Sequence, residues 1–200
     1  MKYLYLQHIP KTGGTSIRRF FWKKQREKIP IRFIWSADWK KAHETFKTRK
    51  EICELTKLKI KPHELFMYVF LRDPIEHTRS LYSWIKDYKP HPYHDYVKKT
   101  DFTTWIQDYK PLTNYYCRLL SPKQENAFKS LENLKHFNHV GRLETIHKDI
   151  DLVINQMGFK FKYDGTHYTG TRTKKFPISK DQIRLIKKRR PEDFKLMEGL

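Results

Sequence analysis

The residues of this chain that are best suited to chemistry form a short segment near its beginning, H-I-P-K-T-G-G-T-S at positions 8–16. Gly13 and Gly14 allow a tight turn that exposes consecutive backbone N–H groups, and a helix that begins near Thr15 adds the positive end of its dipole. Lys11 places a full positive charge beside this turn. Because the apolar run 3–6 comes directly before it, the segment predicts a strand, an anion-binding loop and a helix.

The order of the residues in this loop differs from that of a nucleotide triphosphatase. Such a loop has the pattern G-x-x-x-x-G-K-[ST], in which a lysine follows the glycines and a hydroxyl binds magnesium. Here Lys11 comes before Gly13 and Gly14. A P-loop kinase therefore remains only an alternative, and it would also need a carboxylate for magnesium, for which Asp73 is the obvious candidate.

A second element lies further along the chain. Residues 65–71 form a continuous apolar run, typical of a strand that is buried on both faces of a parallel sheet. Pro74 suits the first turn of a helix, and Asp73 suits its N-cap. We therefore expect Arg72 to end the strand and Ser80 to lie on the helix that follows.

Together these two elements resemble the sulfotransferases, in particular the carbohydrate sulfotransferases. Members of that family carry P-K-T-G-G-T-S in the loop that binds the 5′-phosphosulfate of the sulfuryl donor, 3′-phosphoadenosine 5′-phosphosulfate, and R-D-P…R-x-x-S-x-Y in the element that binds its 3′-phosphate. The resemblance implies that Arg72 and Ser80 bind the 3′-phosphate. It assigns the 5′-phosphate to the backbone N–H groups and hydroxyls of Thr12, Gly13, Gly14, Thr15 and Ser16. Weaker matches at 140–144 and 192–194 extend it over nearly the whole chain.

Sulfuryl transfer needs charge stabilisation on the leaving side and a base on the attacking side. Lys11 is placed to approach the bridging oxygen that gains negative charge, and a fixed ammonium can do what magnesium does in kinases, so no metal is expected. His43 matches the place of an H-x-T-like element in smaller members of the family, and a histidine pKa of about 6.5 suits a base. His8 and then His63 are the next candidates. The late loop of the family, which closes over the adenosine and its 3′-phosphate, corresponds to Arg172 and Thr173.

The charge of the chain indicates an anionic ligand. It has 42 Lys and Arg residues against 22 Asp and Glu, a formal net charge of +20. Nucleic acid, an anionic membrane surface, and an anionic glycan or nucleotide all fit this field. The 12 Tyr, 13 Phe and 5 Trp residues would also suit base stacking in a nucleic-acid-binding protein. That alternative explains the charge but not the loop, so we expect no nucleic acid. The resemblance to the carbohydrate sulfotransferases implies a glycan or glycolipid acceptor.

The order of elements predicts one α/β domain over residues 1–200, with a mainly parallel central sheet flanked by helices. We expect strands at 2–6, 31–35, 65–71 and 137–141. Helices are expected at 15–27, 39–58, 74–87, 102–108, 114–120, 122–134, 144–157, 180–189 and 191–197. Parallel sheets bind ligands beyond the carboxyl ends of their strands, where both elements fall, and residues 88–113 are expected to cap the site. The basic run 187–190 is expected to form a solvated face.

Two further features concern the surroundings of the protein. Cys53 and Cys117 could pair, but the sequence does not decide this. No apolar run is long enough for a transmembrane helix and no signal sequence begins the chain. Since eukaryotic relatives by resemblance sit in the Golgi behind a membrane anchor, we expect either a cytoplasmic enzyme of bacterial or viral origin or a soluble truncated form of a Golgi enzyme.

Overall fold

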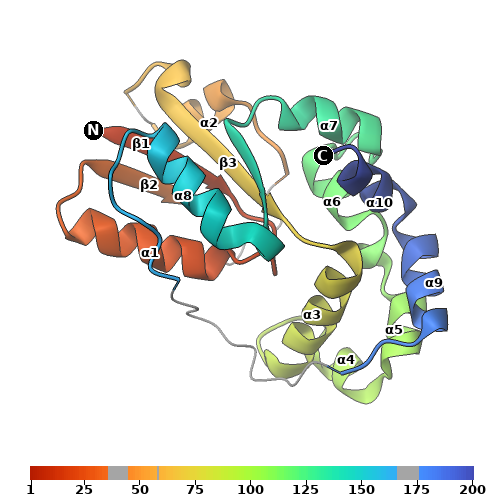
Figure 1. Ribbon diagram of the computed structural model, residues 1–200. Coiled ribbons are helices and arrows are strands. Elements are labelled where there is room, and N and C mark those ends of the chain that lie inside the picture. Colours follow the sequence, from red (N-terminus) through yellow and green to blue (C-terminus); the bar gives the residue numbers. More distant parts are fainter. Residues whose placement is uncertain (36–44, 58, 166–175) are drawn as a thin grey trace.

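The computed structural model describes residues 1–35, 45–57, 59–165 and 176–200, and it contains a four-stranded parallel sheet with helices on both faces (Figure 1). The strands are β1 (Lys2–Gln7), β2 (Ile31–Trp35), β3 (Leu65–Leu71) and β4 (His139–Arg142). Their order across the sheet is β2-β1-β3-β4, and every neighbouring pair is parallel. The predicted α/β class is confirmed.

The helices follow most of the predicted ranges. They are α1 (Gly14–Arg26), α2 (Arg49–Leu55), α3 (Pro74–Asp87), α4 (His94–Lys99), α5 (Phe102–Asp108), α6 (Tyr115–Leu120), α7 (Ala127–Leu134), α8 (Ile146–Gln156), α9 (Lys180–Arg189) and α10 (Pro191–Glu198). Short 3₁₀ turns lie at Pro62–Glu64, Lys110–Leu112 and Leu143–Thr145.

The predicted helix at 39–58 is confirmed only in part, and positions 39–44 and 58 of that range lie outside the described residues. Residues 45–48 are not helical, and α2 begins only at Arg49. The reason is a capping box, in which the Thr48 side chain accepts from the backbone N–H of Glu51 while the Glu51 carboxylate accepts from that of Thr48. Similarly, α7 begins after the cap at Asn126 rather than at 122, and α4 was not predicted.

Alternate residues of the central strands enter two separate cores. Leu4 and Leu6 of β1 pack with the apolar residues of α1 and α8 on one face of the sheet. Tyr5 faces the opposite way, as do Met67 and Val69 of β3, into a larger core built from the other helices. Because successive side chains of a strand point to opposite faces, a continuous apolar run is what such a doubly covered sheet requires.

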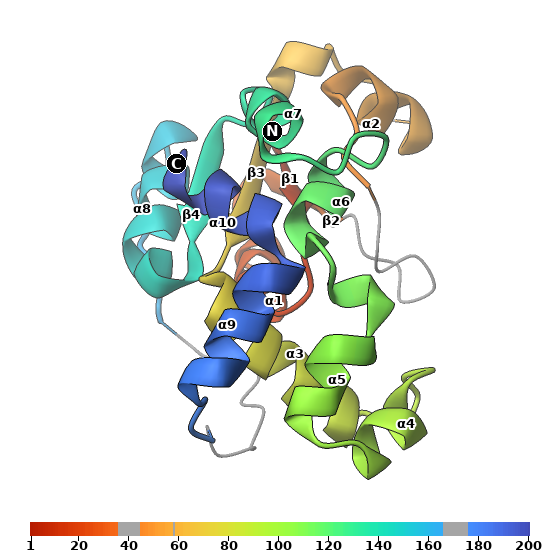
Figure 2. The ribbon, with the colours of Figure 1, turned by 90° about the vertical axis from the view of Figure 1, so that its right-hand side faces the viewer.

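The strand order creates a switch point between β1 and β3. From β1 the chain crosses to β2 on one side, and it later returns to form β3 on the other side of β1. The register pairs Gln7 at the end of β1 with Val69 of β3, so both strands end at the same edge. Ligands of open parallel sheets bind in the crevice at such a point. Beyond this edge lie α3, α5 and α9, as the two views show (Figures 1 and 2).

Two simpler findings concern the cysteines and the helices. Cys53 and Cys117 are both free and buried, so they do not pair. Within the described ranges, no helix combines the length and the apolar character needed to span a membrane.

Candidate anion-binding site

Residues 8–13 join β1 to α1, and we call them the Lys11 loop. The backbone of Lys11 has φ 68° and that of Gly13 has φ 86°, both in the left-handed region. Glycine adopts this region readily, whereas lysine does so only when its surroundings hold it there. One such contact is the hydroxyl of Thr12, which donates a hydrogen bond of 2.7 Å to the carbonyl oxygen of Ile9. The hydroxyl proton of Thr12 is therefore directed into the loop.

The two glycines are required by close packing as well as by conformation. A Cβ atom on Gly14 would lie 2.3 Å from Cδ2 of His8, and one on Gly13 would lie 2.8 Å from Cδ1 of Leu143. The His8 ring also contacts Trp35 edge-on at 4.8 Å between ring centroids. The loop thus lies against the end of β2 on one side and the turn before α8 on the other.

The N-terminus of α1 has the features of an anion site. Gly13 at its N-cap offers no side-chain acceptor, and the first turn contains no acidic residue. By contrast, Asp73 caps α3, accepting hydrogen bonds of 2.9 Å from the backbone N–H groups of Ile75 and Glu76. The predicted N-cap role of Asp73 is confirmed. Because no side chain caps α1, its first N–H groups and dipole can be directed at a bound anion.

One face of α3 brings the predicted cations together. Arg72 forms an ion pair with Glu76, with 3.5 Å between Nη2 and Oε2. The ammonium of Lys11 lies 5.7 Å from the ring centroid of Trp84. Ser80 is four residues after Glu76 and four before Trp84, so these three side chains lie on the same face of the helix. Ser80 therefore lies between the points where Arg72 and Lys11 approach α3.

The two cations affect each other. The pKa of Lys11 is lowered to about 8, first by burial and then by the positive charge of Arg72, while Asp87 opposes the shift. A lysine in this state is stabilised by any anion that binds beside it. The arrangement is thus suited to a ligand with negative charge at both cations.

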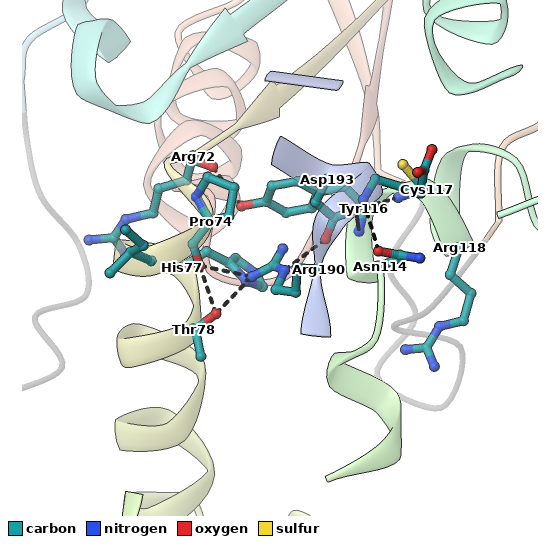
Figure 3. Close-up of polar contacts among 12 residues, drawn as sticks. Arg72, Pro74, His77, Thr78, Asn114, Tyr116, Cys117, Arg118, Arg190 and Asp193 are labelled. Carbon is teal, nitrogen blue, oxygen red and sulfur yellow. Dashed lines mark hydrogen bonds and ion pairs between the residues drawn. The ribbon is translucent and has the colours of Figure 1, made fainter. Parts of the chain in front are cut away.

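A buried polar cluster lies behind this face and was not anticipated from the sequence (Figure 3). Arg190, which the sequence assigned to a solvated basic run, is fully buried together with Asp193, and their side chains pair at 2.7 Å. The second oxygen of Asp193 accepts from the backbone N–H groups of Tyr116 and Cys117 at 3.0 and 2.9 Å. The i, i+3 spacing of Arg190 and Asp193 was the signal available in the sequence.

The predicted site residues divide into two groups. The structure gathers one group at the carboxyl ends of β1 and β3, on the Lys11 loop, the start of α1 and α3: Lys11, Thr12, Gly13, Gly14, Thr15, Ser16, Arg72 and Ser80. The other group, His43, Arg172 and Thr173, lies outside the described residues.

The alternative histidines lie at opposite ends of the sheet. His8 belongs to the Lys11 loop, next to Gly14. His63 precedes β3 and lines a pocket with Lys2 and Tyr3 at the amino ends of the strands. A base acting beside Lys11 cannot come from that edge, so His63 no longer fits the role.

No group of three or more His, Cys, Asp or Glu side chains in the described parts of the chain is arranged to hold a metal ion. Comparison of the chain with protein-family models, curated proteins and solved structures finds no match.

Proposed function

We propose that this protein is a sulfotransferase that moves a sulfuryl group from 3′-phosphoadenosine 5′-phosphosulfate to a hydroxyl of a carbohydrate acceptor, a glycan or a glycolipid. The observation that carries the proposal is the approach of Lys11 and Arg72 to one face of α3, on either side of Ser80. Such a donor has phosphate groups on two carbons of its ribose. Two cations at neighbouring strand ends support its binding better than a single cationic loop would.

The residues of the chain divide the work between the two sides of the transferred group. The bond between sulfur and the 5′-phosphate oxygen breaks, a bond forms between sulfur and the acceptor oxygen, and the hydroxyl proton goes to a base. Lys11 stabilises the charge that grows on the leaving phosphate, and with a pKa of about 8 it is mostly protonated at neutral pH. We assign the base to His43, with His8 as the alternative, and contacts with the adenosine end of the donor to Arg172 and Thr173.

One observation weighs against the kinase alternative. The carboxylate considered for magnesium, that of Asp73, has one of its oxygens engaged by two backbone N–H groups at the start of α3. Moving it toward a metal would cost that helix its cap, which contributes about 1 kcal/mol. The nucleic-acid alternative rests on the charge and the aromatic content of the chain and leaves the Lys11 loop unexplained, whereas the sulfotransferase proposal uses that loop.

Calorimetric titration with adenosine 3′,5′-bisphosphate in EDTA tests the donor site. We expect micromolar binding, weaker binding of adenosine 5′-phosphate, and a loss of about tenfold or more in Arg72→Ala, because a charge-assisted hydrogen bond contributes about 1.5–3 kcal/mol. Lys24→Ala removes the same charge from the last turn of α1, at the far end of that helix, and is the matched control. Equal affinity of the Arg72→Ala and Lys24→Ala proteins would remove Arg72 from the site.

Transfer to a panel of glycans, measured in EDTA, tests the chemistry. We expect turnover without metal and a loss of about 10²–10⁴ in kcat in His43→Ala with donor affinity unchanged. A strict requirement for magnesium in the chemical step would favour the kinase alternative. If His43→Ala keeps its kcat, His8→Ala is the next variant to measure.

A further inference from the structure

His77 is a fully buried histidine in the first turns of α3, and it joins two distant segments of the chain. Its Nε2 lies 2.9 Å from the carbonyl oxygen of Pro10, in the Lys11 loop. Its Nδ1 lies 3.0 Å from Nη1 of Arg190, at the junction of α9 and α10. Figure 3 shows His77 and Thr78 directed from α3 toward Arg190, while the side chain of Arg72 leads away from this cluster.

These two contacts determine the protonation of the His77 ring. An arginine side chain donates hydrogen bonds and cannot accept them, so Nδ1 must be the unprotonated, accepting nitrogen. The ring then carries its proton on Nε2, which donates to the carbonyl oxygen of Pro10. Protonation of Nδ1 would set an N–H group against the guanidinium, so the ring is neutral with one tautomer favoured.

The charges around His77 act in the same direction. Arg190, Arg72 and Lys11 lie near the ring, and burial with these cations holds the pKa of His77 well below its ordinary value. The carboxylate of Asp193, which also belongs to the cluster, pairs with Arg190 and accepts a hydrogen bond from the backbone N–H of Tyr116 at the start of α6. The rings of Tyr115 and Tyr116 also pack against the His77 ring, each at 4.9 Å between centroids.

Arg190 holds the other side of this histidine in place. Its Nε pairs with Asp193, and its Nη1 lies 2.9 Å from both the carbonyl oxygen of Pro74 and the hydroxyl of Thr78. These contacts tie the C-terminal helices to the first turns of α3. The position of His77 is therefore determined by α3 and by the junction of α9 and α10 together.

We infer that His77, kept neutral and in one tautomer by Arg190, is a positioning residue that fixes the backbone at Lys11 and thereby the place of its ammonium. The carbonyl of Pro10 belongs to the same planar peptide group as the backbone nitrogen of Lys11. A hydrogen bond to that oxygen orients the peptide plane, and with it the left-handed φ of 68° at Lys11. The consequence for sulfuryl transfer rests on the proposed function, but the effect on Lys11 does not.

The pKa of Lys11 in the ligand-free protein is the readout that a purely structural role of His77 would not move. After reductive ¹³C-methylation, the dimethyl-lysine signal of Lys11 is followed by NMR against pH and assigned with Lys11→Arg. We expect a pKa near 8 in the parent protein. In His77→Phe, which keeps a ring but loses both polar contacts, it moves toward the ordinary value of about 10.4. In His77→Gln, which keeps a donor and an acceptor, it stays closer to that of the parent.

The control separates positioning from loss of stability. Val153→Ala removes buried atoms from α8, which belongs to the core on the other face of the sheet, and should destabilise the protein while leaving the Lys11 signal unchanged. A folded His77→Phe protein in which Lys11 still titrates near 8 would overturn the inference.

A measurement on the unsubstituted protein covers the case in which His77→Phe does not fold. In ¹⁵N NMR at pH 7, Nδ1 of His77 should show the shift of an unprotonated nitrogen and Nε2 that of a protonated one. The opposite tautomer, or a charged ring, would overturn the inference. If these signals are as expected but adenosine 3′,5′-bisphosphate does not bind, the proposed function fails and the positioning role of His77 stands.

Discussion

The hydroxyl of Tyr116 donates a hydrogen bond of 2.8 Å to the carbonyl oxygen of Arg72. Its ring lies 4.7 Å from the guanidinium carbon of Arg190. The cluster that holds the carbonyl of Pro10 through His77 thus also holds the carbonyl of Arg72. One buried group of residues therefore holds the backbone beside Lys11 and the backbone of Arg72. This group thereby fixes the positions of the two cations relative to each other.

Removing the Tyr116 hydroxyl should weaken anion binding without unfolding the protein. Tyr116→Phe keeps the ring on Arg190 but loses the bond to Arg72, at a cost of about 1 kcal/mol in the free energy of unfolding. Thr56→Val is the control, because it removes a hydroxyl that donates a hydrogen bond of 2.6 Å to the carbonyl oxygen of Ile52 on α2. Urea unfolding should show similar losses, and only Tyr116→Phe should raise the Kd for adenosine 3′,5′-bisphosphate. Equal affinities would mean that this bond does not position Arg72.

Neutralising Glu76 should strengthen anion binding. Its carboxylate pairs with Arg72 at 3.5 Å and with Arg79 more closely, so it competes with a ligand for the positive charge of Arg72. In Glu76→Gln we expect the Kd for adenosine 3′,5′-bisphosphate to fall several-fold by calorimetry. Glu132→Gln, which removes an ion pair of the same i, i+3 type on α7, should leave the affinity unchanged. A higher Kd for adenosine 3′,5′-bisphosphate in Glu76→Gln would indicate that the Glu76 carboxylate instead orients Arg72 for binding.

Anion affinity should fall as the pH rises through about 8. Lys11 in the free protein has its pKa lowered to about 8, and a bound anion favours the charged form, which raises the pKa in the complex. Below pH 8 the ammonium is already charged and binding is at full strength. Above it, the protein must take up a proton to bind, so the Kd rises by up to tenfold per pH unit. Lys11→Met should bind weakly and without this dependence, as titrations from pH 6.5 to 9.5 would show.

The stability of the protein should decrease in mild acid because of His77. Its pKa is far lower in the folded state than the ordinary value of about 6.5, so above pH 6.5 the group is neutral in both states and its contribution is complete. As the pH falls below 6.5, His77 binds a proton in the unfolded chain but stays neutral in the folded protein, so unfolding becomes more favourable. Between pH 7.5 and 5.5 the free energy of unfolding should drop by about 1.4 kcal/mol from this group.

Comparison with His77→Gln isolates that contribution, because the other histidines are common to both proteins. Urea unfolding at the two pH values should show the drop of the parent exceeding that of the variant by the expected amount. Identical pH dependence in both proteins would mean that His77 titrates normally in the folded state.

Alanine at position 14 should be tolerated only when His8 is reduced in size. A Cβ on Gly14 would lie 2.3 Å from Cδ2 of His8, which forces the ring or the loop to move. We expect Gly14→Ala to destabilise the protein by about 1–3 kcal/mol, as overpacking does. In the double variant Gly14→Ala/His8→Ala, the loss in the free energy of unfolding should be smaller than the sum of the two single losses. Urea unfolding of the parent, the two single variants and the double variant measures this. Additive costs would mean that His8 and Gly14 do not restrict each other.

Local sequence patterns predicted most of the fold. The run of apolar residues at 65–71 became β3 with the expected ends, and Asp73 and Pro74 began α3 as a cap and a first-turn proline. These features are set by neighbouring residues, so they can be recognised in the sequence. Within the described part of the helix expected at 39–58, α2 begins only at Arg49 for an equally local reason, the capping box formed by Thr48 and Glu51.

The sequence by itself also determined which residue types stand at the ends of β1 and β3: a lysine with two glycines, and an arginine followed by a capped helix. Only the tertiary structure decided that these ends are neighbours, since the order β2-β1-β3-β4 depends on pairing between residues about sixty positions apart. It also decided that Arg190 is buried. A charged side chain can be buried only where oppositely charged and hydrogen-bonding groups surround it. The partners of Arg190 come from α3 and α10, which are more than a hundred positions apart in the sequence.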